Sequence, residues 1–268
     1  MAKKKVIITG VYGLVGSCIY QRLIAKSDQY EVYGLARRRK RSDRVAEEEA
    51  IDIPEDHVFV SDLSDMDVLE DAFRGMDTVI HMAADPNTEA PWESVLKNNI
   101  EGGYHTFEAA RKAGVKRVIY ASTIQVSTGW ALNVEPYKSI RAQNFENIPE
   151  EFERLKTSEV PWPVNLYASS KVFGETLARM YSSTHGLSCL CLRIGAVNSL
   201  DEKMDHLIPI SCTKEDIARL TECCIQAPDT LKFDIYYGMS NNQYLWPDIA
   251  NAEENVGYIP EDGYRYDD

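Results

Sequence analysis

The chain opens with a strand-like segment that runs directly into a turn with three glycines, and this feature restricts its possible folds most. Residues 6–9 form a β-branched run, Gly10, Gly13 and Gly16 follow, and apolar residues recur at helical spacing over 14–26. Glycines between a strand and a helix let the backbone approach a pyrophosphate, which binds at the helix N-terminus. The pattern predicts a dinucleotide-binding unit. Its expected contacts are Gly10, Tyr12, Gly13, Leu14, Val15 and Gly16.

Strand-like and helix-like segments continue to alternate along the chain. Short β-branched or apolar runs predict strands at 30–36, 57–60, 78–83, 115–122 and 188–194. Apolar residues at helical spacing predict helices at 65–73 (capped by Ser64), 92–113, 167–185 and 213–226. Such alternation is typical of a parallel sheet covered on both faces. The expected fold is therefore α/β, a Rossmann-type doubly wound, mainly parallel sheet.

Two regions interrupt this alternation. Residues 130–164 are irregular and acidic and contain several prolines, and residues 196–268 hold one clear helix followed by mixed short elements. Both follow the C-terminal end of a predicted strand, where the loops of an open α/β sheet build ligand sites. We therefore expect residues 1–195 to form a dinucleotide-binding domain that carries 130–164 as a substrate-side insertion. Residues 196–268 are expected to form a small substrate-binding part packed on that domain.

Composition narrows the class of protein. The chain has 268 residues, with 29 Lys and Arg against 42 Asp and Glu, a net charge of −13. This acidic balance repels phosphate backbones and argues against nucleic-acid binding, and no apolar run reaches the roughly 18 residues of a membrane span. The six cysteines follow no CxxC or zinc spacing, so no metal site is expected. The basic N-terminus leads into a glycine-broken strand without a cleavage site, and most cysteines lie in apolar runs, which together predict a cytoplasmic protein. The expected partner is a small-molecule substrate.

The end of the second predicted strand bears on the choice of cofactor. NAD enzymes favour an acid there to accept the adenosine ribose hydroxyl, whereas this chain has Ala36 followed by five cations at 37–41. Arginine presents a fork of donors that matches a phosphate, so Arg37 and Arg38 are expected to bind the 2′-phosphate of NADP. Residues 39–41 are expected to be a solvated basic loop. NADP is the predicted cofactor, and NAD is the alternative.

The ends of the third and fourth predicted strands supply further cofactor contacts. Asp62 and Leu63 follow the third strand, where a carboxylate can accept a hydrogen bond from the adenine amino group. A helix-capping role for Asp62 is the alternative. His81, in the fourth strand, is expected to be packed rather than catalytic. The residues after it, against which the cofactor would lie, are Met82, Ala83 and Ala84.

The most specific pattern is a tyrosine four residues before a lysine on a predicted helix. Tyr167 and Lys171 share one face of that helix, and a nearby cation stabilises phenolate and lowers the pKa of a tyrosine from its usual value of about 10. Tyr167 would then act as a general base toward an alcohol and, in reverse, as an acid toward a carbonyl. Thr123, at the end of the fifth predicted strand, can hold the substrate oxygen, with Ser122 as the alternative.

Together these motifs resemble the extended short-chain dehydrogenase/reductase superfamily over essentially the whole chain. Segments at 85–86, 89–102, 165–167, 174–181 and 192–195 look like the archaeal NAD-dependent glucose-6-phosphate dehydrogenases and the bacterial uronate dehydrogenases. The resemblance implies oxidation of a cyclic sugar at C1 to its lactone. In that reaction Tyr167 takes the anomeric proton, Thr123 positions the substrate oxygen and Lys171 holds the nicotinamide ribose. Further cofactor contacts implied are Asn99, Ser122 and Ile194, and further substrate contacts are Asp85, Pro86, Ile124, Gln125, Ala196 and Lys203.

The substrate end departs from the uronate enzymes. Ile124 and Gln125 stand where those enzymes carry Asn and His, and Ala196 stands where they carry serine. Those enzymes grip the anionic end of the substrate with an arginine, but none occurs here between 200 and 212, where Lys203 is the only Lys or Arg. The resemblance still implies the same class of reaction, but these departures leave the identity of the sugar open.

Other functions remain open within the same superfamily. The alternatives are a nucleotide-sugar epimerase or dehydratase and a carbonyl reductase. A non-catalytic dinucleotide-binding regulator is disfavoured because Tyr167 and Lys171 are both present. Residues 31–38 look like NADPH-using enone reductases, which favours NADP. As in many relatives, segments 94–113 and 167–185 are expected to pair with a second subunit in a homodimer.

Overall fold

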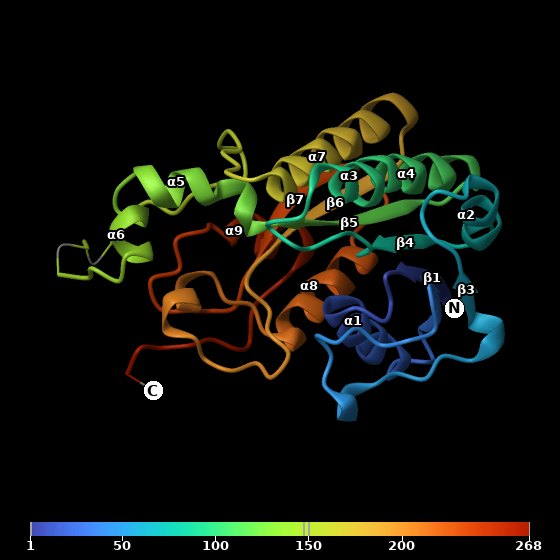
Figure 1. Cartoon of the computed structure of the whole chain (residues 1–268), viewed down its shortest axis with the longest axis horizontal. Helices are drawn as coiled ribbons and strands as arrows, with labels where there is room; N and C mark the ends of the chain where they lie inside the picture. Colours follow the sequence, from blue (N-terminus) through green and yellow to red (C-terminus); the bar gives the residue numbers. More distant parts are fainter. Residues whose placement is uncertain (1, 147, 150, 268) are drawn as a thin grey trace.

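The structure, a computed structural model, describes residues 2–146, 148–149 and 151–267. Its centre is a seven-stranded sheet in the order β3-β2-β1-β4-β5-β6-β7, and every neighbouring pair is parallel (Figure 1). The strands are β1 (Lys4–Thr9), β2 (Tyr30–Ala36), β3 (Val58–Val60), β4 (Thr78–His81), β5 (Arg117–Thr123), β6 (Ser188–Ile194) and β7 (Phe233–Gly238). The strand order reverses between β1 and β4, which creates a switch point there. The predicted Rossmann-type fold is confirmed.

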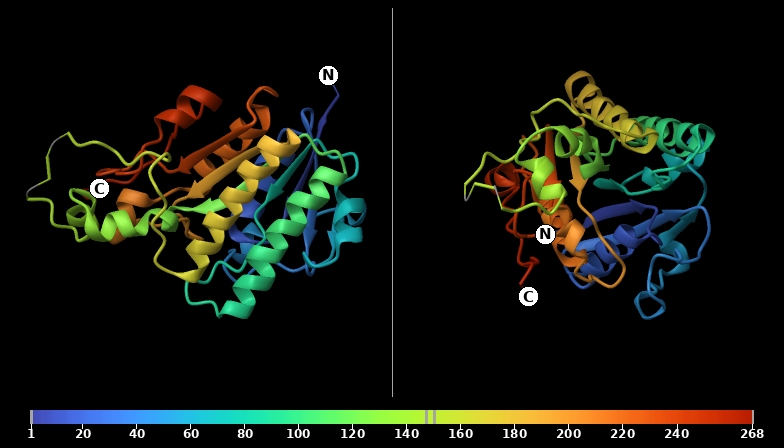
Figure 2. Two further views of the ribbon diagram at one scale, coloured as in Figure 1. Left: turned by 90° about the horizontal axis from the view of Figure 1, so that it is seen from above. Right: turned by 60° about the vertical axis from the view of Figure 1, so that its left-hand side comes forward.

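Helices cover both faces of the sheet (Figures 1 and 2). α1 (Leu14–Ile24) and α8 (Lys214–Gln226) lie side by side on one face. The other face carries α2 (Met66–Phe73), α3 (Trp92–Val95), the π turn η3 (Leu96–Glu101), α4 (Gly102–Lys112) and α7 (Leu166–His185). The shorter elements are η1 (Glu47–Glu49), η2 (Glu55–His57), η4 (Ile124–Ser127), α5 (Thr128–Asn133), α6 (Tyr137–Arg141), η5 (Asp205–Ile210) and α9 (Ala250–Val256). No helix within the described ranges has the length and apolar character needed to cross a bilayer.

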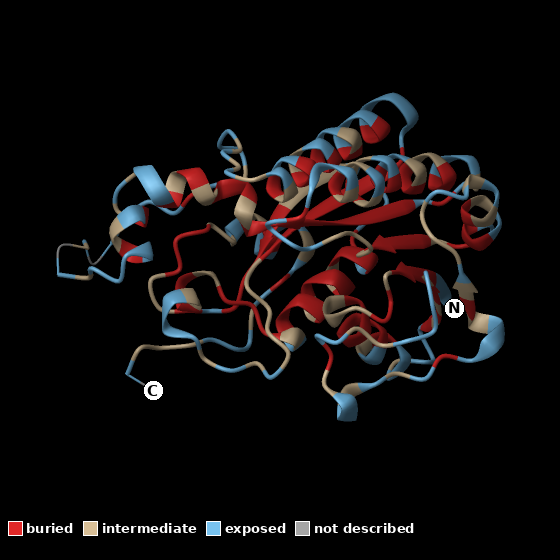
Figure 3. Ribbon diagram, in the orientation of Figure 1, coloured by how far each residue is buried: buried red, intermediate tan, exposed pale blue. Residues whose placement is uncertain are grey.

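The central strands consist largely of buried residues (Figure 3). Their successive side chains enter two different cores. On β5, Ile119 and Ala121 join the core under α1 and α8, whereas Val118 and Tyr120 join the core under α2, α4 and α7. Because both faces of the sheet are covered, the strands read as continuous apolar runs rather than as alternating ones.

Three details of the predicted helices and strands are corrected. Asp65 rather than Ser64 caps α2, because the Asp65 carboxylate accepts a hydrogen bond from the amide of Val68 at 3.2 Å. The helix predicted over 92–113 contains the π turn η3, which the spacing of apolar residues does not reveal. The strand predicted over 78–83 ends at His81, so the residues after it form a loop.

Residues 196–268 do not form a core of their own in the described chain. They add β7 to the edge of the Rossmann sheet and pack α8 on one of its faces. β7 is one of the short elements that the sequence left unassigned. The segment after β7 packs on the insertion 130–164. There Leu155 donates to the carbonyl of Trp246 at 2.8 Å, and both side chains belong to a third buried cluster. The insertion and this segment thus form one lobe beyond the C-terminal ends of the strands.

Candidate active site

A cleft of about 770 Å³ opens at the switch point, along the C-terminal ends of the strands. It brings together the glycine turn, the basic run after β2, the ends of β3, β4 and β5, and the first turns of α7. Of the residues predicted to contact cofactor or substrate, all but Asn99, Ile124 and Lys203 line it. The glycine turn, the basic run and the pair Tyr167 and Lys171, which are far apart in the sequence, therefore share one cavity.

The glycine turn fits a diphosphate because its backbone lies close to neighbouring backbone. Gly10 has a φ of +69°, and a Cβ there would lie 2.9 Å from the amide nitrogen of Ala83. A Cβ on Gly16 would collide with the carbonyl oxygen of Gly10. α1 begins after Gly13 without a side-chain cap and without an acidic residue in its first turn, so its first amides can serve an anion.

His81 is a packed strand residue, as predicted. It is buried, and its Nδ1 lies 2.8 Å from the hydroxyl oxygen of Thr9. Burial and the charge of Lys171 lower the pKa of His81 to about 3, so the ring is neutral at physiological pH. The same Thr9 hydroxyl accepts a hydrogen bond from the amide of Ala83 at 3.2 Å. Thr9 and His81 thus hold the loop after β4 against the glycine turn.

Thr123, Tyr167 and Lys171 meet at the other end of the cleft. Thr123 ends β5, and its hydroxyl hydrogen-bonds the phenol of Tyr167 on the first turn of α7. Lys171 is buried, its Nζ donates to the carbonyl of Ala121 at 2.8 Å, and the same Nζ lies 5.8 Å from the centre of the Tyr167 ring. The arrangement offers a proton acceptor, a hydroxyl and a cation at one point, as a hydroxyl-oxidising site requires.

The pKa of Tyr167 shifts in the direction opposite to the predicted one. Burial raises this pKa above its usual value, and the hydrogen bond from Thr123 and the charge of Arg44 lower it less than burial raises it. The expected lowering by Lys171 does not occur, because its ammonium faces the carbonyl of Ala121 and burial lowers the pKa of Lys171 itself to about 8. Tyr167 is therefore a protonated phenol at neutral pH, and a further positive charge in the cleft would favour its ionisation.

The two candidate hydroxyls at the end of β5 are engaged differently. The hydroxyl of Ser122 is buried and donates to the carboxylate of Glu175 at 2.6 Å, away from Tyr167. The hydroxyl of Thr123 accepts from the amide of Gln125 at 3.3 Å and hydrogen-bonds Tyr167, which leaves it beside the phenol. The geometry favours Thr123 as the hydroxyl that meets a substrate.

Comparison with known proteins agrees with this site. The model of the NAD dependent epimerase/dehydratase family matches residues 6–218. The chain belongs to this family. An NAD-dependent glucose-6-phosphate dehydrogenase of Haloferax volcanii is 34% identical to it, over 96% of this chain and 93% of the relative. The L-arabinose 1-dehydrogenase (NAD(P)(+)) of the same organism is 31% identical over 96% of both chains. The crystal structure of uronate dehydrogenase from Agrobacterium tumefaciens has a TM-score of 0.77 at 25% identity and covers 100% of this chain and 87% of that chain.

Within this member of the epimerase/dehydratase family, Thr123→Val is expected to lower kcat/KM by about 10-fold or more, whereas Thr123→Ser keeps most of the activity. Valine has the same shape but cannot hydrogen-bond the substrate oxygen or Tyr167, and serine retains the hydroxyl. Steady-state kinetics of both variants beside Ser122→Ala would check this. A fully active Thr123→Val enzyme together with a crippled Ser122→Ala enzyme would transfer the role to Ser122.

The three predicted residues outside the cleft have structural contacts. Asn99 is buried on η3, where its side-chain amide bonds both backbone groups of Asp85 and donates to the hydroxyl of Ser170 at 3.0 Å. It therefore holds the loop after β4 against α7. Ile124 is buried in the core beneath the insertion. The Nζ of Lys203 donates to two carbonyls of the C-terminal segment at 3.0 and 3.3 Å.

The basic run after β2 divides between the cleft and the surface. Arg39 turns to Glu55, with a nitrogen–oxygen distance of 3.2 Å, as a solvated loop predicts. Arg44 also lines the cleft, although the sequence offered no periodicity from which to place it. Lys40 and Arg41 were expected in a solvated loop, and their place in the cleft corrects that expectation. The cations of the run that line the cleft are Arg37, Arg38, Lys40 and Arg41.

Asp62 lines the cleft but caps no helix. Its carboxylate accepts a hydrogen bond from the amide of Ser64 at 2.9 Å and pairs with Lys97 at 3.4 Å. Since Asp65 caps α2, the alternative role of Asp62 as its N-cap is wrong.

Proposed function

We propose that this protein is an NAD(P)-dependent dehydrogenase that oxidises a cyclic sugar at C1 to its lactone. The observation that carries the proposal is the meeting of Tyr167, Thr123 and Lys171 in a cleft whose other end is the glycine turn. The sugar dehydrogenases among the relatives support the same reaction class.

Each of the three residues has a task in this reaction. The hydroxyl of Thr123 orients the anomeric oxygen, and the phenolate form of Tyr167, reached once its phenol has lost its proton to solvent, takes the proton from that oxygen while the C1–H bond breaks. Bound NAD(P)⁺ supplies the hydride acceptor, and Lys171 would hold its nicotinamide ribose. The products are the lactone, the reduced cofactor and one proton, which Tyr167 returns to solvent.

We further propose that the sugar is uncharged. Asp85 lines the cleft and its charge acts on Tyr167, although less than that of Arg44, so an anionic substrate group beside Asp85 would meet a carboxylate. Lys203, the cation expected to grip such a group, contacts the C-terminal segment instead. Arg44, whose charge also acts on Tyr167, belongs to the loop that bonds the glycine turn, and we assign it to the cofactor rather than to the sugar. Neutral side chains that suit sugar hydroxyls also line the cleft: Ser94, Asn98 and Gln125.

A substrate panel tests both proposals. L-Arabinose, glucose, glucuronate and glucose 6-phosphate are each incubated with NAD⁺ and NADP⁺, and the reduced cofactor is followed by absorbance. A neutral aldose is expected to give a kcat/KM about 10-fold or more above those of the two anions. Faster oxidation of an anion would contradict the uncharged substrate only. No oxidation of any sugar, with NADPH-dependent reduction of carbonyl compounds, would replace the proposed function by carbonyl reduction.

We propose NADP(H) as the preferred cofactor, supported by Ala36 and by the lining of the cleft by Arg37 and Arg38. Replacing both arginines by alanine is expected to weaken NADPH binding by about 10- to 100-fold and to change NADH binding little, because only NADPH carries the 2′-phosphate. Calorimetric titration of both dinucleotides measures the difference. Arg39→Ala is the control, since Arg39 contacts Glu55. Tighter binding of NADH than of NADPH by the native protein would contradict the preference.

We also propose that the protein forms a homodimer through α3, α4 and α7. These helices lie together on one face of the sheet, where the Tyr181 hydroxyl of α7 donates to Glu108 of α4 at 3.0 Å. Large apolar side chains remain exposed on them, as on a surface covered by a second copy. They are Trp92, Tyr104, Leu166, Phe173 and Met180. Sedimentation as a monomer at micromolar concentration would contradict this assignment.

A further inference from the structure

The loop between β2 and η2, residues 37–54 and here called the strap, runs along one side of the cleft. It supplies Arg44, which lines the cleft. Within the described chain, no carboxylate lies within ion-pair distance of the Arg44 guanidinium. We propose that Arg44 binds the diphosphate of the dinucleotide, so that this guanidinium completes the anion site begun by the glycine turn. The inference rests on dinucleotide binding, as the proposed function does.

Hydrogen bonds hold Arg44 against the glycine turn. The amide of Ser42 donates to the carbonyl of Tyr12 at 2.9 Å, and the amide of Val45 donates back to the carbonyl of Ser42 at 3.0 Å. The side chain of Val45 is buried. Arg44 therefore lies within a short turn that is bonded to the glycine turn at one end and anchored in the protein interior at the other.

The position of Arg44 selects the diphosphate among the anionic groups that could enter the cleft. The strap bonds Tyr12, in the glycine turn where the amides of α1 start, and the charge of Arg44 also reaches Tyr167. Arg44 thus lies on a turn that is bonded to the glycine turn and has its charge within reach of Tyr167, and the group that joins the two halves of a dinucleotide is its diphosphate. The 2′-phosphate lies at the far end of the adenosine half, where Arg37 and Arg38 directly follow β2.

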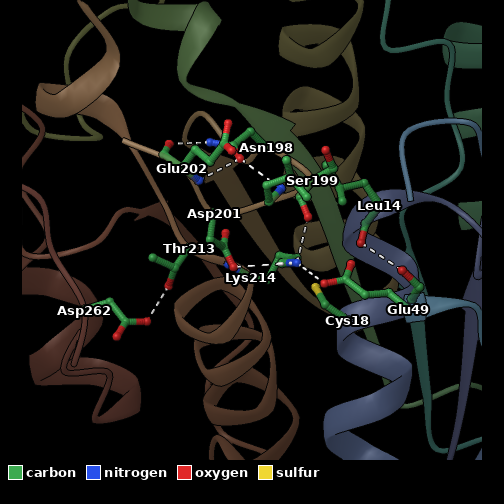
Figure 4. A network of polar contacts seen from close by, with 12 residues as sticks. Leu14, Cys18, Glu49, Asn198, Ser199, Asp201, Glu202, Thr213, Lys214 and Asp262 are labelled. Carbon is green, nitrogen blue, oxygen red and sulfur yellow. Dashed lines mark hydrogen bonds and ion pairs between the residues drawn. The ribbon is translucent and has the colours of Figure 1, made fainter. Parts of the chain in front are cut away.

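An ion pair at the other end of the strap fixes its course. The Nζ of Lys214, at the start of α8, contacts the carboxylate of Glu49 and donates to the carbonyl of Ser199 at 2.8 Å (Figure 4). The backbone amide of Lys214 donates to Asp201 at 3.1 Å. Lys214 therefore ties the strap to the loop after β6, which lines the cleft through Ala196. Glu49 is a positioning residue that acts through Arg44.

Calorimetric titration of NADH, NADPH and ADP into the full-length protein, without sugar, tests the assignment. Arg44→Met is expected to weaken all three by about the same factor, 10- to 100-fold, because all three carry a diphosphate. Arg39→Met, on the same strap but paired with Glu55, is the matched control and should leave the three affinities unchanged. Glu49→Gln should weaken them less, and only while Arg44 is present, so that it adds nothing in the Arg44→Met background.

The outcomes separate this inference from the proposed function. Unchanged affinities in Arg44→Met would overturn the inference, and so would a loss confined to NADPH, which would place Arg44 at the 2′-phosphate. Normal dinucleotide affinity with lost turnover of one anionic sugar would overturn it too, since Arg44 would then bind substrate. If the native protein bound neither NADH nor NADPH, both the proposed function and the inference about Arg44 would fail. If dinucleotides bind and no sugar is oxidised, only the sugar reaction fails.

Discussion

Replacing Tyr167 by Phe is expected to lower kcat for sugar oxidation by about 10²- to 10⁴-fold, which is the contribution of a well-placed general base. The ring of Phe fills the same space beside Thr123 and Lys171, so dinucleotide affinity should change little. Steady-state kinetics combined with calorimetric titration of NADPH would separate the two effects.

The pH dependence gives this experiment a second readout. Since burial raises the pKa of Tyr167, native oxidation is expected to rise with pH as the phenol loses its proton, and the residual activity of Tyr167→Phe should lack that rise. Tyr33→Phe is a suitable control, because Tyr33 lies on β2, outside both the cleft and the proposed dimer face. Near-native turnover by Tyr167→Phe would remove the proposed mechanism.

The largest expected effect on stability is at Arg193. Arg193→Met should lower the free energy of unfolding by about 3–5 kcal/mol, because it leaves the carboxylate of Glu175 buried without its cation. The two side chains are 1% and 5% exposed, and two nitrogen–oxygen contacts of 2.9 Å join them. Ser122 would remain as a donor to Glu175, and one neutral hydroxyl does not replace a guanidinium. Urea denaturation at neutral pH measures the loss.

A double variant distinguishes a lost ion pair from lost packing. Glu175→Leu combined with Arg193→Met removes both charges and should recover much of the stability lost in the single variant. Arg111→Met breaks the exposed contact with Glu108 and is expected to shift the denaturation midpoint little. A single variant within about 1 kcal/mol of the native protein would show that water or rearrangement compensates the buried carboxylate.

This buried pair also explains which hydroxyl is left for chemistry. Glu175 lies on α7 and Arg193 on β6, and together they draw the Ser122 hydroxyl of β5 into the interior. The next side chain along the strand points to the other face, since side chains alternate along β5. The hydroxyl of Thr123 thereby lies beside Tyr167 in the cleft. Between two adjacent residues that the sequence left open, a charge pair more than fifty positions away therefore favours Thr123.

Features encoded in short stretches of sequence were predictable. The bounds of β2 and β6 agree with the predicted strands, because mainly apolar residues bury β6 along its whole length and alternate positions of β2. The glycine turn and the pair Tyr167 and Lys171 needed only local spacing, since a turn and one face of a helix involve neighbours in the chain. The packed role of His81 followed from its place inside a buried strand.

Features that depend on distant segments were decided by the tertiary structure alone. The direction of the pKa shift of Tyr167 depends on how much protein buries the phenol, and no local pattern records that burial. The orientation of Lys203 depends on where the C-terminal segment packs. Arg44 reaches the cleft only because the strap is bonded to Tyr12 at one end and to Lys214 at the other. An irregular loop has no periodicity from which its course can be predicted, so its contacts with the rest of the fold determine where its side chains lie.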